Sequence, residues 1–192
     1  MRRAAYGIVL GILVGCSASV RSGAPHTGPT PPPPSVRAQP SRLVVLVVID
    51  QLPSWAFATR APLAREGLRR LLDRGVLFSR LRFPYAATLT AVGHAALVSG
   101  AAPAQSGIVS NRHLDRATDK LLPVTFDPAY PVLDAPEAAG VSPRALRVAT
   151  VSDGVRQRGG QVLALSVKDR AAVMMGGKRP TLALWYDAQP GG

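Results

Sequence analysis

Three groups of polar side chains could do chemistry in this sequence, each next to a predicted element. Asp50 directly follows the apolar run 43–49, Thr90 directly precedes a stretch of small apolar residues, and Lys168–Arg170 directly follow the apolar run 162–167. A carboxylate at a strand end is a hard ligand for a divalent cation. A threonine hydroxyl at a helix N-terminus feels the positive end of the helix dipole, which favours its alkoxide and any attached anion. A neighbouring metal would lower the hydroxyl pKa further and make it a nucleophile.

Lys168 and Arg170 are two positions apart, so they would project from one side if the preceding strand continued through them. There they could clamp an oxyanion, the arginine with a planar fork and the lysine with a point charge. Each group also has an ordinary structural explanation. Asp50 could cap a turn, Thr90 could be a capping hydroxyl worth about 1 kcal/mol, and the triplet could be a solvated turn. Taken together, polar groups at three strand ends favour a functional site.

The surrounding pattern predicts an α/β fold, with a mainly parallel sheet sandwiched by helices. The runs 43–49 and 162–167 are typical of strands buried on both faces. Further predicted elements are a strand-like segment over 76–83, a strand over 181–186, and helices over 62–74, 91–99 and 148–157, with an irregular stretch between the last two helices. Alternating strands and helices imply right-handed βαβ units, in which sites lie at the carboxyl ends of the strands.

The N-terminus has the composition of an export signal. A positive start is followed by an apolar stretch over 4–14, which is too short to span a membrane as a helix. It ends in Leu-Val-Gly-Cys at Cys16, which resembles a bacterial lipobox, and Ser17 is what lipoproteins sorted to the outer membrane usually show. We therefore predict a signal peptide over 1–16, lipidation of Cys16 and an anchored domain facing the periplasm. The alternative is a buried cysteine in a hydrophobic N-terminal helix.

Residues 17–42 contain seven prolines and predict an extended, disordered tether that holds the domain 43–192 off the membrane surface. The net charge of +12 includes five arginines before residue 43 and no acid there, so 43–192 carry eighteen basic and eleven acidic residues, a net of +7. Aromatic residues are only 5% of the chain, so stacking platforms for nucleic acid are poorly supplied. We therefore expect no nucleic-acid partner.

Several segments together resemble the N-terminal part of the alkaline phosphatase superfamily. The branch that they resemble is the phosphate-irrepressible alkaline phosphatases, related to type I phosphodiesterases and nucleotide pyrophosphatases. The segments that carry the resemblance are Val-Val-Ile-Asp-Gln-Leu at 47–52, the stretch 85–94, Gly-Ile-Val-Ser-Asn at 107–111, Ser-Pro-Arg at 142–144, the stretch 166–172 and Trp-Tyr-Asp at 185–187.

The resemblance implies a phosphoryl-transfer site with two zinc ions. Asp50 would be a zinc ligand, and Thr90 would be both a metal ligand and the nucleophile that forms a phosphothreonine. Asn111 would bind a phosphoryl oxygen through its amide, and Lys168 with Arg170 would stabilise the other oxygens. Because a phosphate monoester brings about two negative charges, these extra cations favour a small phosphomonoester substrate over a diester. The alternative within the superfamily is a phosphodiesterase or nucleotide pyrophosphatase.

Two zinc ions need about six to eight ligands, and this sequence offers few. Its histidines are His26, His94 and His113, none in a paired arrangement, and we expect His94 to be a structural residue behind the nucleophile. The family supplies most ligands from further downstream. The sequence therefore predicts the N-terminal fragment of a larger enzyme, or alternatively a non-catalytic, truncated surface lipoprotein.

Overall fold

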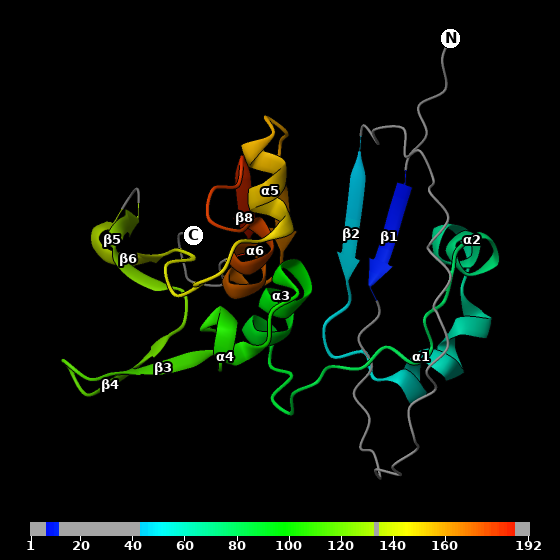
Figure 1. Ribbon diagram of the computed structural model, residues 1–192, viewed down its shortest axis with the longest axis horizontal. Helices are drawn as coiled ribbons and strands as arrows, with labels where there is room; N and C mark the ends of the chain where they lie inside the picture. Colours follow the sequence, from blue (N-terminus) through cyan, green and yellow to red (C-terminus); the bar gives the residue numbers. More distant parts are fainter. Residues whose placement is uncertain (1–6, 12–42, 133–134, 187–192) are drawn as a thin grey trace, which may run out of the picture. The chain divides into compact units, whose positions relative to one another are not determined.

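The computed structural model describes residues 7–11, 43–132 and 135–186 (Figure 1). The chain forms two compact units, which we call the N-terminal unit (Met1–Arg82) and the C-terminal unit (Phe83–Gly192). Cys16 and the predicted tether 17–42 lie outside the described residues, so lipidation and the tether stay predictions. Among the described residues, no helix has the length and apolar character needed to span a membrane.

The N-terminal unit contains one parallel strand pair and a short helical segment. β1 (Gly7–Gly11) pairs with β2 (Val44–Val48), with Gly7 opposite Val44 and Gly11 opposite Val48. The chain continues through α1 (Ser54–Arg60), the 3-10 turn η1 (Ala61–Leu63) and α2 (Glu66–Arg74). The helix predicted over 62–74 is therefore divided, because Ala64 and Arg65 adopt extended conformations between η1 and α2.

Two predictions for this unit are wrong. Val44–Val47 of β2 were expected to be buried on both faces, but their side chains are 38–62% exposed. The reason is that β1 is the element packed extensively on β2, and within the described residues of the N-terminal unit no helix covers the pair as a parallel sheet requires. The strand predicted over 76–83 is also absent: the segment has a turn at 79–80 and is otherwise irregular, with Val76 and Phe78 largely exposed.

The C-terminal unit begins with two helices and two antiparallel hairpins. The helices are α3 (Thr90–Ser99) and α4 (Pro103–Ser106). The hairpins are β3 (Arg112–Asp115) with β4 (Lys120–Pro123), and β5 (Phe126–Val132) with β6 (Ala135–Val141). They occupy the stretch that was predicted to be irregular.

A βαβ unit completes the C-terminal unit; both of its strands were predicted, but its helix over 169–176 was not. After α5 (Val151–Gln157), β7 (Leu163–Ser166) pairs in parallel with β8 (Leu182–Trp185), and α6 (Asp169–Gly176) connects them. Helix α6 packs on both strands, which buries Ala164 but leaves Leu163 and Leu165 on β7 exposed. The α/β class is therefore confirmed, whereas burial of β7 on both faces is wrong because one face lacks a covering helix among the described residues.

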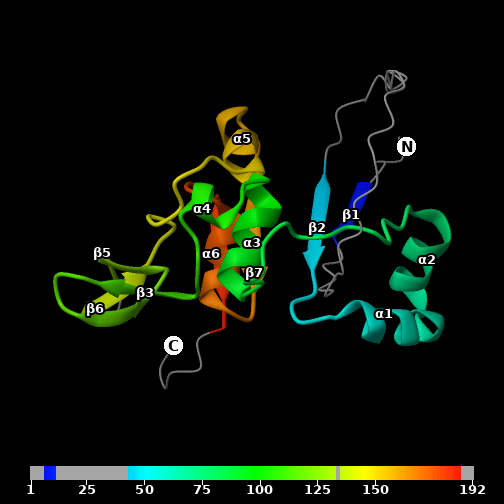
Figure 2. The same cartoon turned by 60° about the horizontal axis from the view of Figure 1, so that its bottom comes forward.

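The core of the C-terminal unit lies between α3 and α6, which stand side by side in both views (Figures 1 and 2). Small residues of α3 allow the close approach, and Met174 of α6 fills the interface with no exposed surface. The buried core consists of Ala91, Val92, Ala95, Ile108, Val124, Leu146, Val173 and Met174. The first turn of α3 is thus part of a dense interior, to which α6 contributes Val173 and Met174.

Candidate functional site

Thr90 is the first residue of α3, and its side chain is only 7% exposed. The residue before it, Leu89, is extended (φ −74°, ψ 162°) and has no side-chain oxygen to accept from the first-turn amides. Helix N-termini leave such amides without an intrahelical acceptor. The start of α3 therefore needs an acceptor from elsewhere in the chain.

Asn111 supplies that acceptor from a distant loop. Its Oδ1 accepts a hydrogen bond from the Ala91 N–H at 2.8 Å, and its backbone carbonyl accepts from the Val124 N–H at 2.9 Å. Because an N–H donor requires the oxygen of the amide, this contact fixes which way the Asn111 side chain faces. The amide N–H groups of Asn111 are thereby oriented beside the residue that follows Thr90, where they can donate to an anion.

The turn that leads to Asn111 depends on glycine. Gly107 ends α4 in the left-handed conformation (φ 80°), and a Cβ there would lie 2.9 Å from the Ala145 carbonyl oxygen. The next residue, Ile108, is fully buried in the core. The glycine turn and the buried Ile108 thus hold the 107–111 segment in place, so that Asn111 lies at the start of α3.

Lys168 and Arg170 occupy the start of α6. The condition under which they would project from one side of a strand is not met, because β7 ends at Ser166, whose Oγ accepts the Lys168 N–H at 3.1 Å. Lys168 is the extended N-cap, and its carbonyl accepts from Ala171 and Ala172. Lys168 therefore lies at the N-cap of α6 and Arg170 in its first turn. Their charges add to the positive end of the helix dipole, at a second helix N-terminus besides that of α3.

Arg170 lies beside its own neighbour Asp169. Its Nη1 is 3.6 Å from Asp169 Oδ1, and its Nε is buried with no hydrogen-bond acceptor among the described residues. The side chain is 33% exposed, so part of the guanidinium still reaches solvent. The cation is thus held near a carboxylate without a full set of hydrogen bonds.

Consecutive residues connect the two helix starts. Val124 donates to the Asn111 carbonyl at 2.9 Å, and the hydroxyl of the next residue, Thr125, donates to Asp169 Oδ2 at 2.8 Å. Residues 124–125 therefore contact both the loop of Asn111 and the first turn of α6. Thr125 and Asp169 carry no role in the sequence prediction, and no spacing pattern indicates a contact 44 positions apart.

The His94 side chain hydrogen-bonds to the backbone of the first turn of α3. It is 6% exposed, and its Nδ1 lies 2.7 Å from the Thr90 carbonyl oxygen. Since a carbonyl only accepts, Nδ1 carries the proton of this contact. The geometry agrees with the structural role predicted for His94.

Asp50 belongs to the N-terminal unit and is solvent-exposed two positions after β2. The following residue, Gln51, has φ 61°, an uncommon conformation for a residue with a side chain. Within its own unit, the described structure offers Asp50 no cluster of further ligands, since no group of three or more His, Cys, Asp or Glu capable of holding a metal occurs among the described residues.

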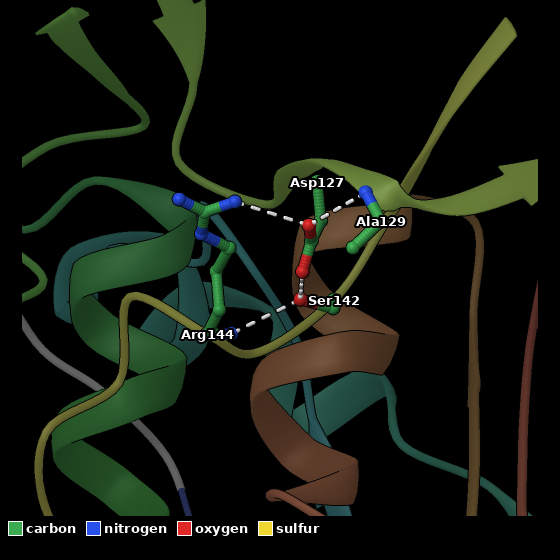
Figure 3. Close-up of polar contacts among 4 residues, drawn as sticks. All are labelled: Asp127, Ala129, Ser142 and Arg144. Atoms are coloured by element: carbon green, nitrogen blue, oxygen red, sulfur yellow. Dashed lines mark hydrogen bonds and ion pairs between the residues drawn. The ribbon is translucent and has the colours of Figure 1, made fainter.

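A second polar cluster, shown in Figure 3, was missed by the sequence prediction. Asp127 is 3% exposed, and its Oδ2 accepts from the Ser142 hydroxyl at 2.5 Å. Its Oδ1 accepts from the Ala129 N–H at 3.0 Å and from Arg144 Nη1 at 3.1 Å. The Ser142 hydrogen bond, followed by those from Ala129 and Arg144, lowers the pKa of Asp127 below its usual range. The cluster ties the β5–β6 hairpin to the loop after it.

A signal for this cluster was present in part. The Ser-Pro-Arg segment at 142–144 contributed to the family resemblance but had no assigned role, and Asp127 lay in the stretch considered irregular. Asp127 accepts from Ser142 because the β5–β6 hairpin brings these two residues, fifteen positions apart in the sequence, into contact.

Comparison with known proteins identifies the family. The model of the type I phosphodiesterase / nucleotide pyrophosphatase family matches residues 44–146, which is more than half of the chain. This chain belongs to that family. It therefore belongs to the alkaline phosphatase superfamily, and the predicted resemblance is confirmed.

Curated relatives include two alkaline phosphatases. PhoV of Synechococcus elongatus is 33% identical over 190 residues, which cover 96% of this chain and 34% of PhoV. PafA of Elizabethkingia meningoseptica is 32% identical over 190 residues, which cover 95% of this chain and 33% of PafA. The chain thus spans about a third of the length of these relatives.

Solved structures show the same likeness. The crystal structure of wild-type PafA superposes with a TM-score of 0.61 at 30% identity, over 72% of this chain and 27% of that one. A PafA variant superposes with a TM-score of 0.60 at 27% identity, and in it a threonine is replaced by serine while an asparagine, a lysine and an arginine are replaced by alanine.

Proposed function

We propose that this chain forms the nucleophile and phosphate-binding part of a phosphoric monoester hydrolase. The observation that carries the proposal is the hydrogen bond from the Ala91 N–H to Asn111 Oδ1 at 2.8 Å. It sets the amide donors of Asn111 next to a threonine at the positive end of a buried helix. A hydroxyl, an amide donor and a helix N-terminus together suit a phosphoryl group.

The substituted PafA variant supports the choice of residues. By its numbering, the threonine and asparagine replaced in it are 21 positions apart, and the lysine and arginine are two apart. Thr90 and Asn111 are likewise 21 positions apart, and Lys168 and Arg170 are two apart. We therefore assign nucleophilic attack to Thr90 and binding of the phosphoryl oxygens to Asn111, Lys168 and Arg170.

The proposed reaction has two displacements at phosphorus. Thr90 Oγ forms a bond to phosphorus as the bond to the ester oxygen breaks, and the leaving alcohol takes up the proton that Thr90 loses. Water then attacks the phosphothreonine, which restores the Thr90 hydroxyl and releases inorganic phosphate. Asn111, Lys168 and Arg170 stabilise negative charge on the non-bridging oxygens in both steps.

The proposed cofactor is zinc, and Asp50 and Thr90 are each proposed as a zinc ligand. A carboxylate and a hydroxyl oxygen are suitable donor types, and zinc bound there would lower the pKa of the Thr90 hydroxyl. The described residues fit a metal pair only in part, because further ligands would have to come from outside them. No step of the reaction is assigned to the metal.

The proposal includes export and anchoring. The lipobox-like ending at Cys16 favours a lipid anchor in the outer membrane facing the periplasm, where a small phosphate ester would be the substrate. Residues 7–11 of the predicted signal form β1, and processing before Cys16 would remove this strand. Mass spectrometry of the mature N-terminus tests the anchor, and an unmodified Met1 would contradict it.

Exchange of Thr90 tests the nucleophile. In the full-length protein we expect Thr90→Ala to lower kcat for an aryl phosphate by a factor on the order of a thousand or more, because the residue that forms the covalent bond is lost. Thr90→Ser keeps a hydroxyl and should retain far more activity. Undiminished turnover by Thr90→Ala would show that another group attacks phosphorus.

A diesterase is the second candidate, because the matching family model is named for phosphodiesterases. The Lys168→Ala/Arg170→Ala double variant separates the two functions. For a monoesterase, kcat/KM falls much more for an aryl phosphate than for a methyl aryl phosphate diester, which has fewer negative charges to bind. An equal loss on both substrates favours the diesterase. If the protein bound no stoichiometric zinc and turned over neither ester, the non-catalytic alternative would hold.

A further inference from the structure

Thr125 occupies an unusually constrained position beside the proposed phosphate clamp. It is fully buried, and its carbonyl accepts from the Ser142 N–H at 2.8 Å. The residue before it, Val124, is part of the core and donates to the Asn111 carbonyl at 2.9 Å. Hydrogen bonds at Val124 and at the Thr125 carbonyl therefore fix the Thr125 backbone, and with it the position of the hydroxyl.

The Thr125 hydroxyl is directed at a carboxylate that faces Arg170. It donates to Asp169 Oδ2 at 2.8 Å, while Asp169 Oδ1 lies 3.6 Å from Arg170 Nη1. A distance of 3.6 Å is longer than a hydrogen bond between an arginine and a carboxylate, which is usually about 2.7–2.9 Å. The carboxylate thus orients the guanidinium without using up its N–H donors.

On this geometry, and resting on the proposed function, we propose that Thr125 is a positioning residue that acts through Asp169 to hold Arg170 ready for a phosphoryl oxygen. Without the hydroxyl, Asp169 loses a fixed partner and can turn toward the cations at the start of α6. A closer ion pair would occupy the donors of Arg170 and place a negative charge in competition with the substrate. Thr125 itself touches neither substrate nor the reacting atoms.

The test measures binding of inorganic phosphate to the full-length protein by titration calorimetry. Thr125→Val keeps the side-chain shape and removes the hydroxyl, and we expect it to raise the Kd for phosphate about five- to tenfold, the effect of one lost hydrogen bond of about 1 kcal/mol. Thr125→Ser restores the donor and should bind phosphate within about twofold of the wild-type protein.

Thr118→Val is a matched control. The Thr118 hydroxyl also donates to an aspartate, Asp115 Oδ2 at 2.7 Å, but in the exposed turn of the β3–β4 hairpin. Its loss should leave the Kd for phosphate unchanged. Thermal unfolding of each variant separates loss of the fold from loss of binding, because a purely structural role lowers Tm without changing the Kd of the folded protein.

A double-mutant cycle with Arg170→Ala decides whether Thr125 acts through Arg170. If it does, adding Thr125→Val to Arg170→Ala weakens phosphate binding no further. Additive losses, or a Thr125→Val variant that binds phosphate like the wild-type protein, would overturn the inference and leave the proposed function standing. Absence of phosphate binding by the wild-type protein would instead contradict the proposed clamp, and the positioning role with it.

Discussion

The α3–α6 region holds the residues proposed to bind phosphate, the β1–β2 region precedes the proposed metal ligand Asp50, and the two regions differ in how far their side chains are buried. In the first, Thr90 and Met174 belong to a buried interior, and Asn111 is fixed by hydrogen bonds of 2.8 and 2.9 Å. In the second, Asp50 is exposed and follows strand β2, whose side chains at Val44–Val47 are 38–62% exposed. Within this chain, the elements proposed to bind phosphate are held in a packed interior, whereas the proposed metal ligand Asp50 is exposed.

The difference has a physical origin in the covering of the strands. Helix α6 lies against β7 and β8, whereas β2 has β1 as its packed neighbour, and β1 falls within the predicted signal peptide. Apolar strand side chains contribute to stability in proportion to the surface they bury. The C-terminal unit should therefore be the more stable, and the following predictions test that contrast in order of decreasing effect.

Removal of a core side chain should affect the C-terminal unit most. Met174 is fully buried, so Met174→Ala should lower the free energy of unfolding of this unit by about 3 kcal/mol. Leu46 on β2 is 38% exposed, and Leu46→Ala should cost its unit less than about 1 kcal/mol. Hydrogen exchange of peptides from each unit measures both effects, and equal losses would contradict the contrast.

The buried carboxylate of Asp127 should give a smaller, pH-dependent effect. Asp127→Asn should lower the free energy of unfolding at pH 7 by about 2 kcal/mol, the order of one charge-assisted hydrogen bond. Because the Ser142 hydroxyl and its other donors lower the pKa of Asp127, its contribution is fully present above the usual carboxyl pKa of about 4. That contribution is lost as the pH falls through the lowered pKa of the folded state.

Urea unfolding between pH 7 and pH 2.5 checks this prediction. The wild-type protein should lose more stability below about pH 4 than Asp127→Asn does. Asp115→Asn is the comparison: hydrogen bonds from Thr118 and Ala117 also lower the pKa of Asp115, but in an exposed hairpin turn, where the change of stability with pH should be smaller. Parallel pH profiles for wild-type protein and Asp127→Asn would contradict the assignment.

Substitution of Asn111 separates its two roles. Asn111→Ala removes the acceptor for the Ala91 N–H and should cost about 1 kcal/mol of stability. Asn111→Asp keeps that acceptor and suits the helix dipole, so the fold should retain its stability. Its carboxylate lacks amide donors and repels an anion, so phosphate binding should weaken more than about tenfold. Retained phosphate affinity in Asn111→Asp would show that the amide does not bind the phosphoryl group.

The surface ion pair of α2 should give the smallest effect. Arg69 and Asp73 pair at helical spacing on an exposed surface of the N-terminal unit. The hydrogen-bonded contact raises the pKa of Arg69 and lowers the pKa of Asp73. Water and salt nevertheless screen such exposed pairs. Arg69→Ala should leave Tm unchanged within error at physiological salt, and a marked drop in Tm would contradict this.

Much of the fold could be predicted where the pattern is local. The small apolar run after Thr90 predicted α3, the helix predicted over 148–157 includes α5 at 151–157, and the runs around Ala164 and Ala183 predicted β7 and β8. The hairpins β3–β4 and β5–β6 were missed. Their strands contain exposed Pro, Lys and Arg residues and a buried Asp127, so they lack the apolar alternation on which strand prediction depends.

The candidate site shows the same division. Thr90, Lys168 and Arg170 could be singled out because each stands at the end of an element that the sequence reveals. The contacts that position them could not, since Ala91 with Asn111 and Thr125 with Asp169 are 20 and 44 positions apart. Such pairs follow from how helices and hairpins pack, which a single sequence does not encode as a local pattern.

The most direct test of the account is to trap the phosphorylated enzyme. The full-length protein, supplied with zinc and an aryl phosphate, is quenched in acid during turnover, and its peptides are examined by mass spectrometry. We predict a single phosphothreonine at Thr90, and none in Thr90→Ala treated in the same way. Turnover with no phosphate on Thr90, or with phosphate on another residue, would contradict the central claim.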